Sequence, residues 1–198
     1  MASITLATED ELSEAIGTRL LAEIDLLPDQ IQSLRKNGSG YLKLNIKSWK
    51  ELARIRPVLL ITDLDNVACP VTMREQLIGS GPIPKNLLIR IAVREVESWV
   101  LADHDAAENL FGRKIKLPPE PDTLPDPTSH LLRLAKSASR KVRDNLVKEA
   151  NAVARQGLGY NAHLKAWILT HWNPERAASR SPSLARTRLR LQDLQGRM

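Results

Sequence analysis

One short stretch, Val58–Thr62, restricts the fold more than any other part of the sequence. Its β-branched and aliphatic residues are typical of a strand buried on both faces of a parallel sheet. The run ends at Asp63-Leu64-Asp65-Asn66, where strand alternation predicts both aspartates on one face, about 7 Å apart at Cα. Because open α/β sheets bind ligands at the carboxyl ends of their strands, this pair indicates a divalent-cation site. A turn or helix cap is the alternative, since Asp and Asn favour both.

Acidic residues also follow two further predicted strands, Ser3–Ala7 and Leu87–Val93. Glu9 comes directly after the first strand, and Glu95 and Glu97 come after the other. Parallel strands end at the same edge of a sheet, so the sequence predicts that four carboxylates converge there: Glu9, Asp63, Asp65 and Glu97. The alternative is that acids in a first helical turn merely complement the helix dipole.

The order of elements predicts the class of fold. Thr8 and Glu11 match a capping box that opens a helix through Ile24. We expect a short helix around Asp29–Arg35 and a short strand or loop over Tyr41–Ile46. Further helices are expected over Lys47–Ile55, Pro70–Ile78 and Arg94–Asp103. This alternation predicts an α/β fold with a mainly parallel sheet flanked by helices, followed by a helical C-terminal extension.

The C-terminal part differs in composition and charge. Five prolines in Phe111–Pro127 indicate a linker, which divides the chain into a core (1–112), a linker (113–127) and a basic helical part (128–198). We expect one long helix from Thr128 or Ser129 to about Ala154, then a helix to about His171 and a last one from Ser181. From His130 to Met198 there are 14 basic and 4 acidic residues, against 15 and 19 in the rest of the chain.

An acidic half joined to a basic half suits a polyanionic substrate. A solvated basic helical surface is the alternative. The basic residues that we expect to contact a nucleic acid are Arg133, Lys136, Arg140, Lys141, Arg143, Arg186 and Arg188.

Composition excludes several classes of protein. A chain of 198 residues with 42% hydrophobic content fits one α/β domain with appended helices. No apolar run is long enough to span a bilayer and no signal-peptide pattern opens the chain, so no membrane partner is expected. The single cysteine, Cys69, excludes an intrachain disulfide and favours a cytoplasmic setting. The four histidines are dispersed and have no cysteine partners, which argues against a zinc site.

The position of Glu9 after a first strand and of Asp63-x-Asp65 after a later one resembles the TOPRIM core of topoisomerases, primases and overcoming-lysogenization-defect nucleases. Residues 8–15, 60–70, 92–103 and 181–186 are similar to a set of small, mostly uncharacterised bacterial TOPRIM-like proteins. One position departs from the pattern, because Asp10 stands where a glycine often follows the first glutamate.

This resemblance implies a nuclease that uses Mg²⁺ or Mn²⁺. Glu9 would be the general acid/base or first metal ligand, Asp63 and Asp65 would be ligands, and Glu97 and Asp103 would complete the cluster. The implied substrate is DNA in preference to RNA, and the implied setting is phage defence beside an ABC-type ATPase. The alternative is a non-catalytic nucleic-acid-binding or ATPase-docking subunit with a degenerate site. Homo-oligomer formation is left open.

Overall fold

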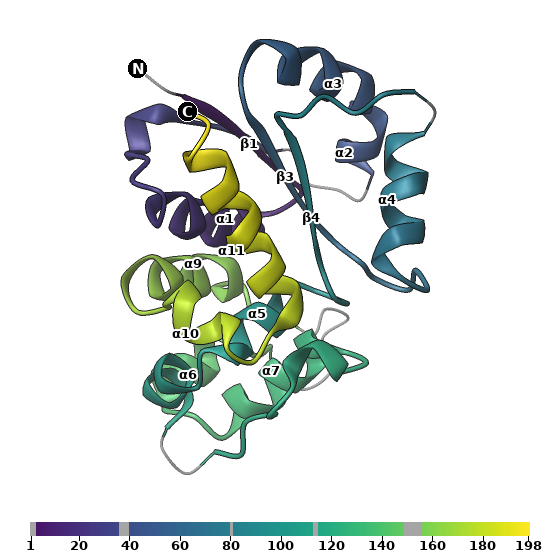
Figure 1. Ribbon diagram of the computed structural model, residues 1–198. Coiled ribbons are helices and arrows are strands. Elements are labelled where there is room, and N and C mark those ends of the chain that lie inside the picture. The colour runs from purple at the N-terminus through teal and green to yellow at the C-terminus, as the bar shows by residue number, and fades with distance from the viewer. Residues whose placement is uncertain (1–2, 36–39, 80, 113–114, 149–155) are drawn as a thin grey trace.

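The computed structural model describes residues 3–35, 40–79, 81–112, 115–148 and 156–198. Its centre is a four-stranded, all-parallel sheet in the order β2-β1-β3-β4 (Figure 1). The strands are β1 (Ile4–Thr8), β2 (Ile31–Arg35), β3 (Val58–Asp63) and β4 (Leu87–Ala92). The predicted α/β fold with a parallel sheet flanked by helices is therefore confirmed, as are the three strands predicted from sequence.

The central position of β3 explains its continuous apolar run. β3 pairs with β1 on one side and with β4 on the other, and its residues from Val58 to Ile61 are fully buried. Alternate side chains enter two different clusters: Leu59 and Ile61 belong to a larger core, and Val58 and Leu60 to a smaller one. The period of two along the strand thus supplies both faces of the sheet with apolar side chains.

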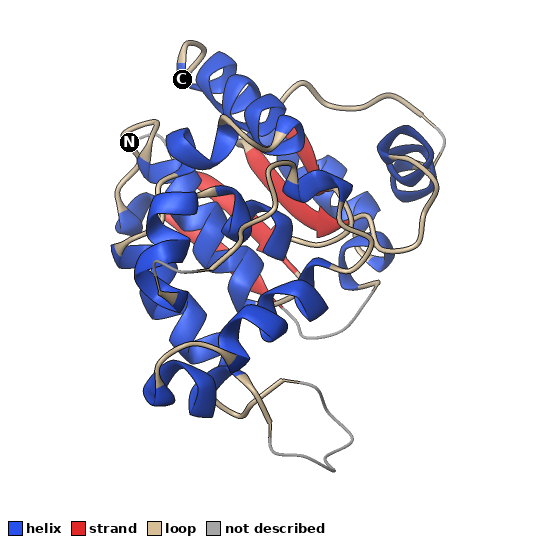
Figure 2. Cartoon of the chain, turned by 90° about the horizontal axis from the view of Figure 1, so that it is seen from below, coloured by secondary structure: helices blue, strands red, loops and turns tan. Residues whose placement is uncertain are grey.

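Helices cover both faces (Figures 1 and 2). The smaller core is closed by α3 (Ile46–Ile55), α4 (Pro70–Ile78) and the short helix α2 (Tyr41–Leu44), which contribute Trp49, Leu77 and Leu42. The larger core begins with α1 (Glu11–Ala22). The helices described after β4 are α5 (Glu97–Ala102), α6 (His104–Phe111), α7 (Pro127–Lys136), α8 (Arg140–Leu146), α9 (Tyr160–Thr170), α10 (Pro174–Ala178) and α11 (Pro182–Gln195).

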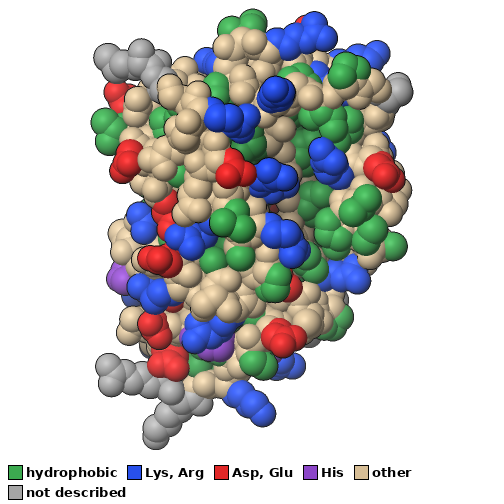
Figure 3. Space-filling view, viewed as in Figure 1, with side chains coloured by type: hydrophobic (Ala, Val, Ile, Leu, Met, Phe, Trp, Pro, Cys, Tyr) green, Lys and Arg blue, Asp and Glu red, His purple; other side chains and the backbone are tan. Residues whose placement is uncertain are grey.

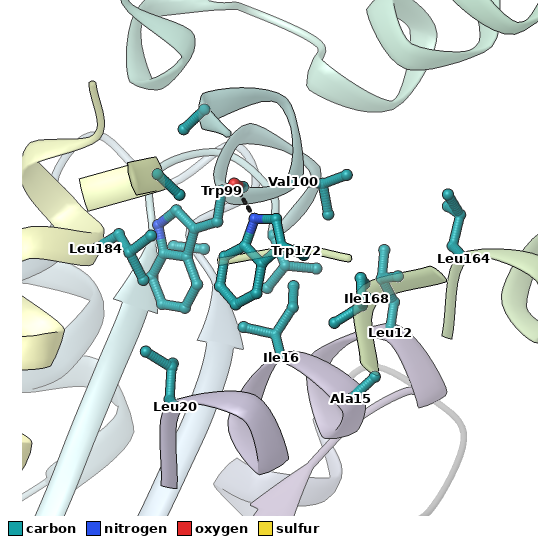
Figure 4. Packing of buried hydrophobic residues seen from close by; sticks show 14 of the residues in the cluster. Leu12, Ala15, Ile16, Leu20, Trp99, Val100, Leu164, Ile168, Trp172 and Leu184 are labelled. Atoms are coloured by element: carbon teal, nitrogen blue, oxygen red, sulfur yellow. Dashed lines mark hydrogen bonds between the residues drawn. The ribbon is translucent and has the colours of Figure 1, made fainter. Parts of the chain in front are cut away.

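The C-terminal helices share one core with α1. Leu164 and Ile168 of α9 lie against Leu12, Ala15 and Ile16 of α1, as the close view shows (Figure 4). This continuous apolar cluster places the C-terminal helices directly on the layer that covers the sheet. In the described part of the chain, no helix is both long and apolar enough to cross a membrane.

Two local predictions between β1 and β3 are wrong. The helix expected around Asp29–Arg35 is a short 3-10 helix (Pro28–Gln30) followed by strand β2, and Tyr41–Ile46 begins with helix α2. Residues 31–35 form a strand because pairing with β1 lets Ile31 pack on the larger core and Leu34 on the smaller one.

Helix caps also differ from the prediction. The cap of α1 is Asp10, whose Oδ1 accepts the N–H of Ser13 at 2.7 Å, so the Thr8–Glu11 capping box is wrong. The long basic helix predicted from Thr128 or Ser129 is two helices, because Asp126 caps α7 and Ser139 caps a separate α8. The remainder of that predicted helix, from residue 149 to about Ala154, lies outside the described residues.

Candidate metal centre

The structure brings four predicted carboxylates to one edge of the sheet. Asp63 is the last residue of β3, Asp65 lies two residues beyond it, Glu9 directly follows β1, and Glu97 begins α5 after β4. β1, β3 and β4 are parallel neighbours, so these positions share the carboxyl edge. Two further acids interact electrostatically with them, Asp10 and Glu95. We call these six residues the acidic cluster: Glu9, Asp10, Asp63, Asp65, Glu95 and Glu97.

Asp63 has a strongly perturbed environment at this edge. Burial raises the pKa of its carboxyl group well above the usual range, and the nearby charges of Glu97, Asp10 and Asp65 raise it further. One opposing contact is the backbone N–H of Val96, which donates to Oδ1 at 2.9 Å. A carboxylate in this setting needs either a proton or a cation.

Asp65 reaches the edge through a turn, not through an extended strand. β3 ends at Asp63, and Asp65 adopts a left-handed conformation with φ of 49°. The turn is tied to the loop after β4, where Arg94 is also left-handed: the N–H of Asp65 donates to the Arg94 carbonyl at 2.8 Å, and the Arg94 guanidinium donates to the Asp65 carbonyl at 2.8 Å. The predicted strand alternation across Asp63 and Asp65 is therefore wrong, although the exposed Asp65 carboxylate still acts on Asp63 electrostatically.

Glu9 follows β1, which pairs with β3 on the side opposite to β4. The N–H of Gly40 donates to its Oε1 at 3.2 Å. Burial raises the pKa of Glu9 despite this hydrogen bond, and Asp65 and Asp10 add to the effect. Asp10 caps α1, and its negative charge raises the pKa values of Glu9, Asp63 and Glu97.

Glu97 is the most deeply buried acid of the cluster. Its Oε1 accepts a hydrogen bond of 2.8 Å from the hydroxyl of Tyr160, 63 residues later in the chain. Burial raises the pKa of Glu97 to about 7, although the Tyr160 hydrogen bond opposes the rise. Glu95 instead binds the start of α7, because its Oε2 accepts from the N–H and the hydroxyl of Thr128. Nothing in the local sequence around Tyr160 or Thr128 signals either contact.

Asp103 has a different role from the metal ligation that the resemblance implies. Its carboxylate is fully buried and accepts two hydrogen bonds from Arg176, at 2.8 and 2.7 Å, and one from the N–H of Asn173 at 2.8 Å. It also caps α6 by accepting from Ala106. Both oxygens are thus used to join α6 to α10, and the acids that perturb Glu9, Asp63 and Glu97 do not include it.

A polar core fixes α5, the helix that carries Glu97. The indole N–H of Trp172 donates to the carbonyl of Trp99 at 3.0 Å (Figure 4). The indole N–H of Trp99 donates to Ser183 Oγ at 2.7 Å, and Asp122 accepts from Ser181 Oγ and from the N–H of Ser183. The Ser181-Pro182-Ser183 segment therefore joins α11 to α5 and supports the position of Glu97.

The donor set fits a hard cation. The cluster offers only carboxylate oxygens, which suit Mg²⁺ and Mn²⁺ better than zinc. Over the described residues, no three His, Cys, Asp or Glu side chains form a group able to hold a metal ion directly. Mg²⁺ keeps several waters and binds through one or two carboxylates, so a site for it needs fewer than three protein ligands.

The predicted nucleic-acid-binding residues lie on α7, α8 and α11. On α8, Arg140 and Arg143 form ion pairs with Asp144, and Lys141 is exposed. On α7, Arg133 contacts His130 and Lys136 is exposed.

The two arginines of α11 have different surroundings. Arg188 forms two hydrogen bonds with the Glu23 carboxylate, at 2.8 and 3.0 Å, and so joins α11 to the end of α1. Arg186 instead lines a pocket beside β4.

Comparisons with protein-family models, curated proteins and solved structures find no match for the chain.

Proposed function

We propose that this chain is a divalent-metal-dependent phosphodiesterase of the TOPRIM type that acts on a nucleic acid. The observation that carries the proposal is the acidic cluster at the carboxyl edge of β1, β3 and β4. Burial and like charge raise the pKa values of Asp63, Glu9 and Glu97 together. Strongly perturbed groups of one sign at a ligand-binding edge are typical of functional sites.

The residues divide the work by position. Asp63 and Asp65 would hold Mg²⁺ or Mn²⁺, which supplies Lewis acidity at the scissile phosphate. Glu9 directly follows the neighbouring strand β1 and burial raises its pKa, so its carboxyl group suits proton transfer to or from the reacting oxygen. Glu97 accepts a hydrogen bond from Tyr160 and would adjust the charge of the site through its electrostatic effect on Asp63.

Plasmid nicking in the presence of Mg²⁺ or Mn²⁺ tests the activity. We expect the wild type to convert supercoiled plasmid to nicked or linear forms. The Asp63→Asn variant should do so at least about 100-fold more slowly, because it lacks a carboxylate that would bind the metal. Asp29→Asn is the matched control, because Asp29 is exposed on the 3-10 helix before β2. Equal rates for wild type and Asp63→Asn would reject the assignment.

A second candidate is a non-catalytic nucleic-acid-binding or ATPase-docking subunit. Two observations favour it: no three-residue metal group forms among the described residues, and Asp10 replaces the usual TOPRIM glycine. This candidate predicts no nicking with either metal. In both versions we propose that the chain works in phage defence with an ABC-type ATPase, as the resemblance implies.

A further inference from the structure

A trough with basic side chains runs along β4, the edge strand of the sheet. Its main part has a volume of about 780 Å³ and lies over Leu87–Arg90, between α4 and α11. A smaller pocket of about 160 Å³ continues it as far as Ile91 and shares Arg74, Ile89 and Arg90 with it. The space-filling view shows Lys and Arg side chains gathered on this face of the molecule (Figure 3). The cations that line the trough are Arg74, Lys85, Arg90, Arg186, Arg190 and Arg197.

These cations are poorly neutralised. Asp193 is the acid that lines the trough, and it forms an ion pair with Arg190 at 3.2 Å. Within the described ranges, Arg74, Lys85, Arg90 and Arg186 form no ion pair with a carboxylate. Arg90 donates to the backbone carbonyls of Ile89 and Arg186, and burial together with Arg190, Arg74 and Arg186 lowers its pKa to about 10. The trough therefore concentrates positive charge that the protein itself does not balance.

The direction of β4 relates the trough to the acidic cluster. The main part lies beside the amino end of the strand, and the smaller pocket lies beside Ile89–Ile91. The next residue, Ala92, pairs in register with Asp63. At about 3.3 Å per residue, Leu87 and Ile91 are about 13 Å apart. The trough thus extends along the strand toward the edge at which Asp63 lies.

We propose that this trough binds the sugar–phosphate backbone of a nucleic-acid strand and leads the strand to the acidic cluster. The inference rests on the proposed function and names the surface by which that site takes its substrate. It also moves the main phosphate contacts from α7 and α8 to α4, β4 and α11, with Arg186 common to both sets.

The chemistry of the trough favours a phosphate backbone. Arginine binds phosphate through two parallel hydrogen bonds, and five of the six cations are arginines. None of the described lining residues is aromatic, so the trough offers no surface on which bases stack. We therefore expect contacts to phosphates, with little dependence on base sequence.

Binding of a fluorescent oligothymidylate of about 20 nucleotides, measured by anisotropy in EDTA, tests the proposal. The trough variant is Arg74→Gln/Lys85→Gln/Arg186→Gln, which changes exposed side chains of α4, the loop before β4, and α11. We expect it to bind at least about 10-fold more weakly at about 50 mM salt and to lower the slope of log affinity against log salt by about 2.

A control with the same loss of charge is Arg133→Gln/Lys136→Gln/Arg140→Gln, in exposed side chains of α7 and α8. We expect its affinity to fall less than about 3-fold. Equal losses in the two variants would overturn the proposal, because binding would then follow net charge alone. Polyglutamate that displaces the oligonucleotide at equal charge concentration would also overturn it, in favour of an acidic polypeptide.

This assay is independent of the proposed activity. Trough-dependent binding by a chain that does not nick plasmid would support this inference and reject the nuclease. Metal-dependent nicking that the trough variant retains in full, with unchanged oligonucleotide affinity, would reject the trough and support the nuclease.

Discussion

Glu97 shows how one buried group can make stability depend on pH. Its side chain is almost fully enclosed, and its raised pKa means that the folded protein keeps a proton that the unfolded chain has already lost. Between the ordinary value of 4.5 and about 7, the folded state therefore binds more protons than the unfolded state. By linkage, the stability from this group is complete below pH 4.5 and is lost as pH rises to about 7.

We predict that Glu97→Gln removes the loss of stability that the wild type shows as the pH rises from 4.5 to about 7. The glutamine keeps an oxygen that accepts from Tyr160 and has no charge to bury. Relative to wild type, the variant should gain up to about 3 kcal/mol more stability at about pH 8 than at about pH 4.5, because burial raises the pKa of Glu97 from 4.5 to about 7. Urea unfolding in EDTA at both pH values measures it, with the exposed Glu75→Gln as control. An equal effect at both pH values would contradict the raised pKa.

Asp103 and Arg176 join α6 to α10 through an ion pair in which the Asp103 carboxylate is the buried partner. Arg176 is partly exposed, whereas Asp103 is fully enclosed. Without the guanidinium, the Asp103 carboxylate would keep only backbone donors, and an unbalanced buried charge is costly. The pair therefore contributes to the packing of the C-terminal helices.

We predict that Arg176→Gln lowers the free energy of unfolding by about 2 to 4 kcal/mol. Arg54→Gln serves as the control, because it breaks the solvent-exposed Arg54–Glu51 pair on α3 and should cost no more than about 1 kcal/mol. Denaturant unfolding of both variants at neutral pH gives the comparison. Similar losses would show that burial of Asp103 does not decide the strength of its pair.

Local sequence patterns predict the elements whose own residues indicate a strand or the start of a helix. β3 is bordered by two strands and so needs an apolar run, and α4 begins at Pro70, the residue predicted to open it. β2 was missed because its pairing with β1 outweighs local propensity. The break between α7 and α8 was missed because Ser139 caps a new helix inside a continuous basic stretch.

The candidate site also has features that the sequence predicts and features that it does not. The positions of Glu9, Asp63 and Glu97 at one edge follow from strand order, which the sequence pattern indicates. The hydrogen bond of Glu97 with Tyr160 and the use of Asp103 by Arg176 join residues 63 and 73 positions apart. Such contacts depend on how the C-terminal helices pack, which no local motif encodes.

The whole molecule separates two kinds of charge. Acids gather at the carboxyl edge of the sheet, and cations that outnumber the acids around them line the trough beside β4 that extends toward it. A polyanion bound along the trough and a divalent cation bound at the edge would each balance a charge that the protein leaves uncompensated. Metal binding at the acidic cluster is the step on which the proposed activity depends.

Calorimetric titration of Mn²⁺ at about pH 6, in buffers of different ionisation enthalpy, tests that step. Because carboxyl groups with raised pKa values must lose protons to bind a cation, we predict Mn²⁺ binding with release of up to about one proton by the wild type and by Asp29→Asn. Asp63→Asn should lose the binding heat and the proton release together. Absence of Mn²⁺ binding in the wild type, or identical titrations for Asp63→Asn and wild type, would contradict a metal centre at this edge.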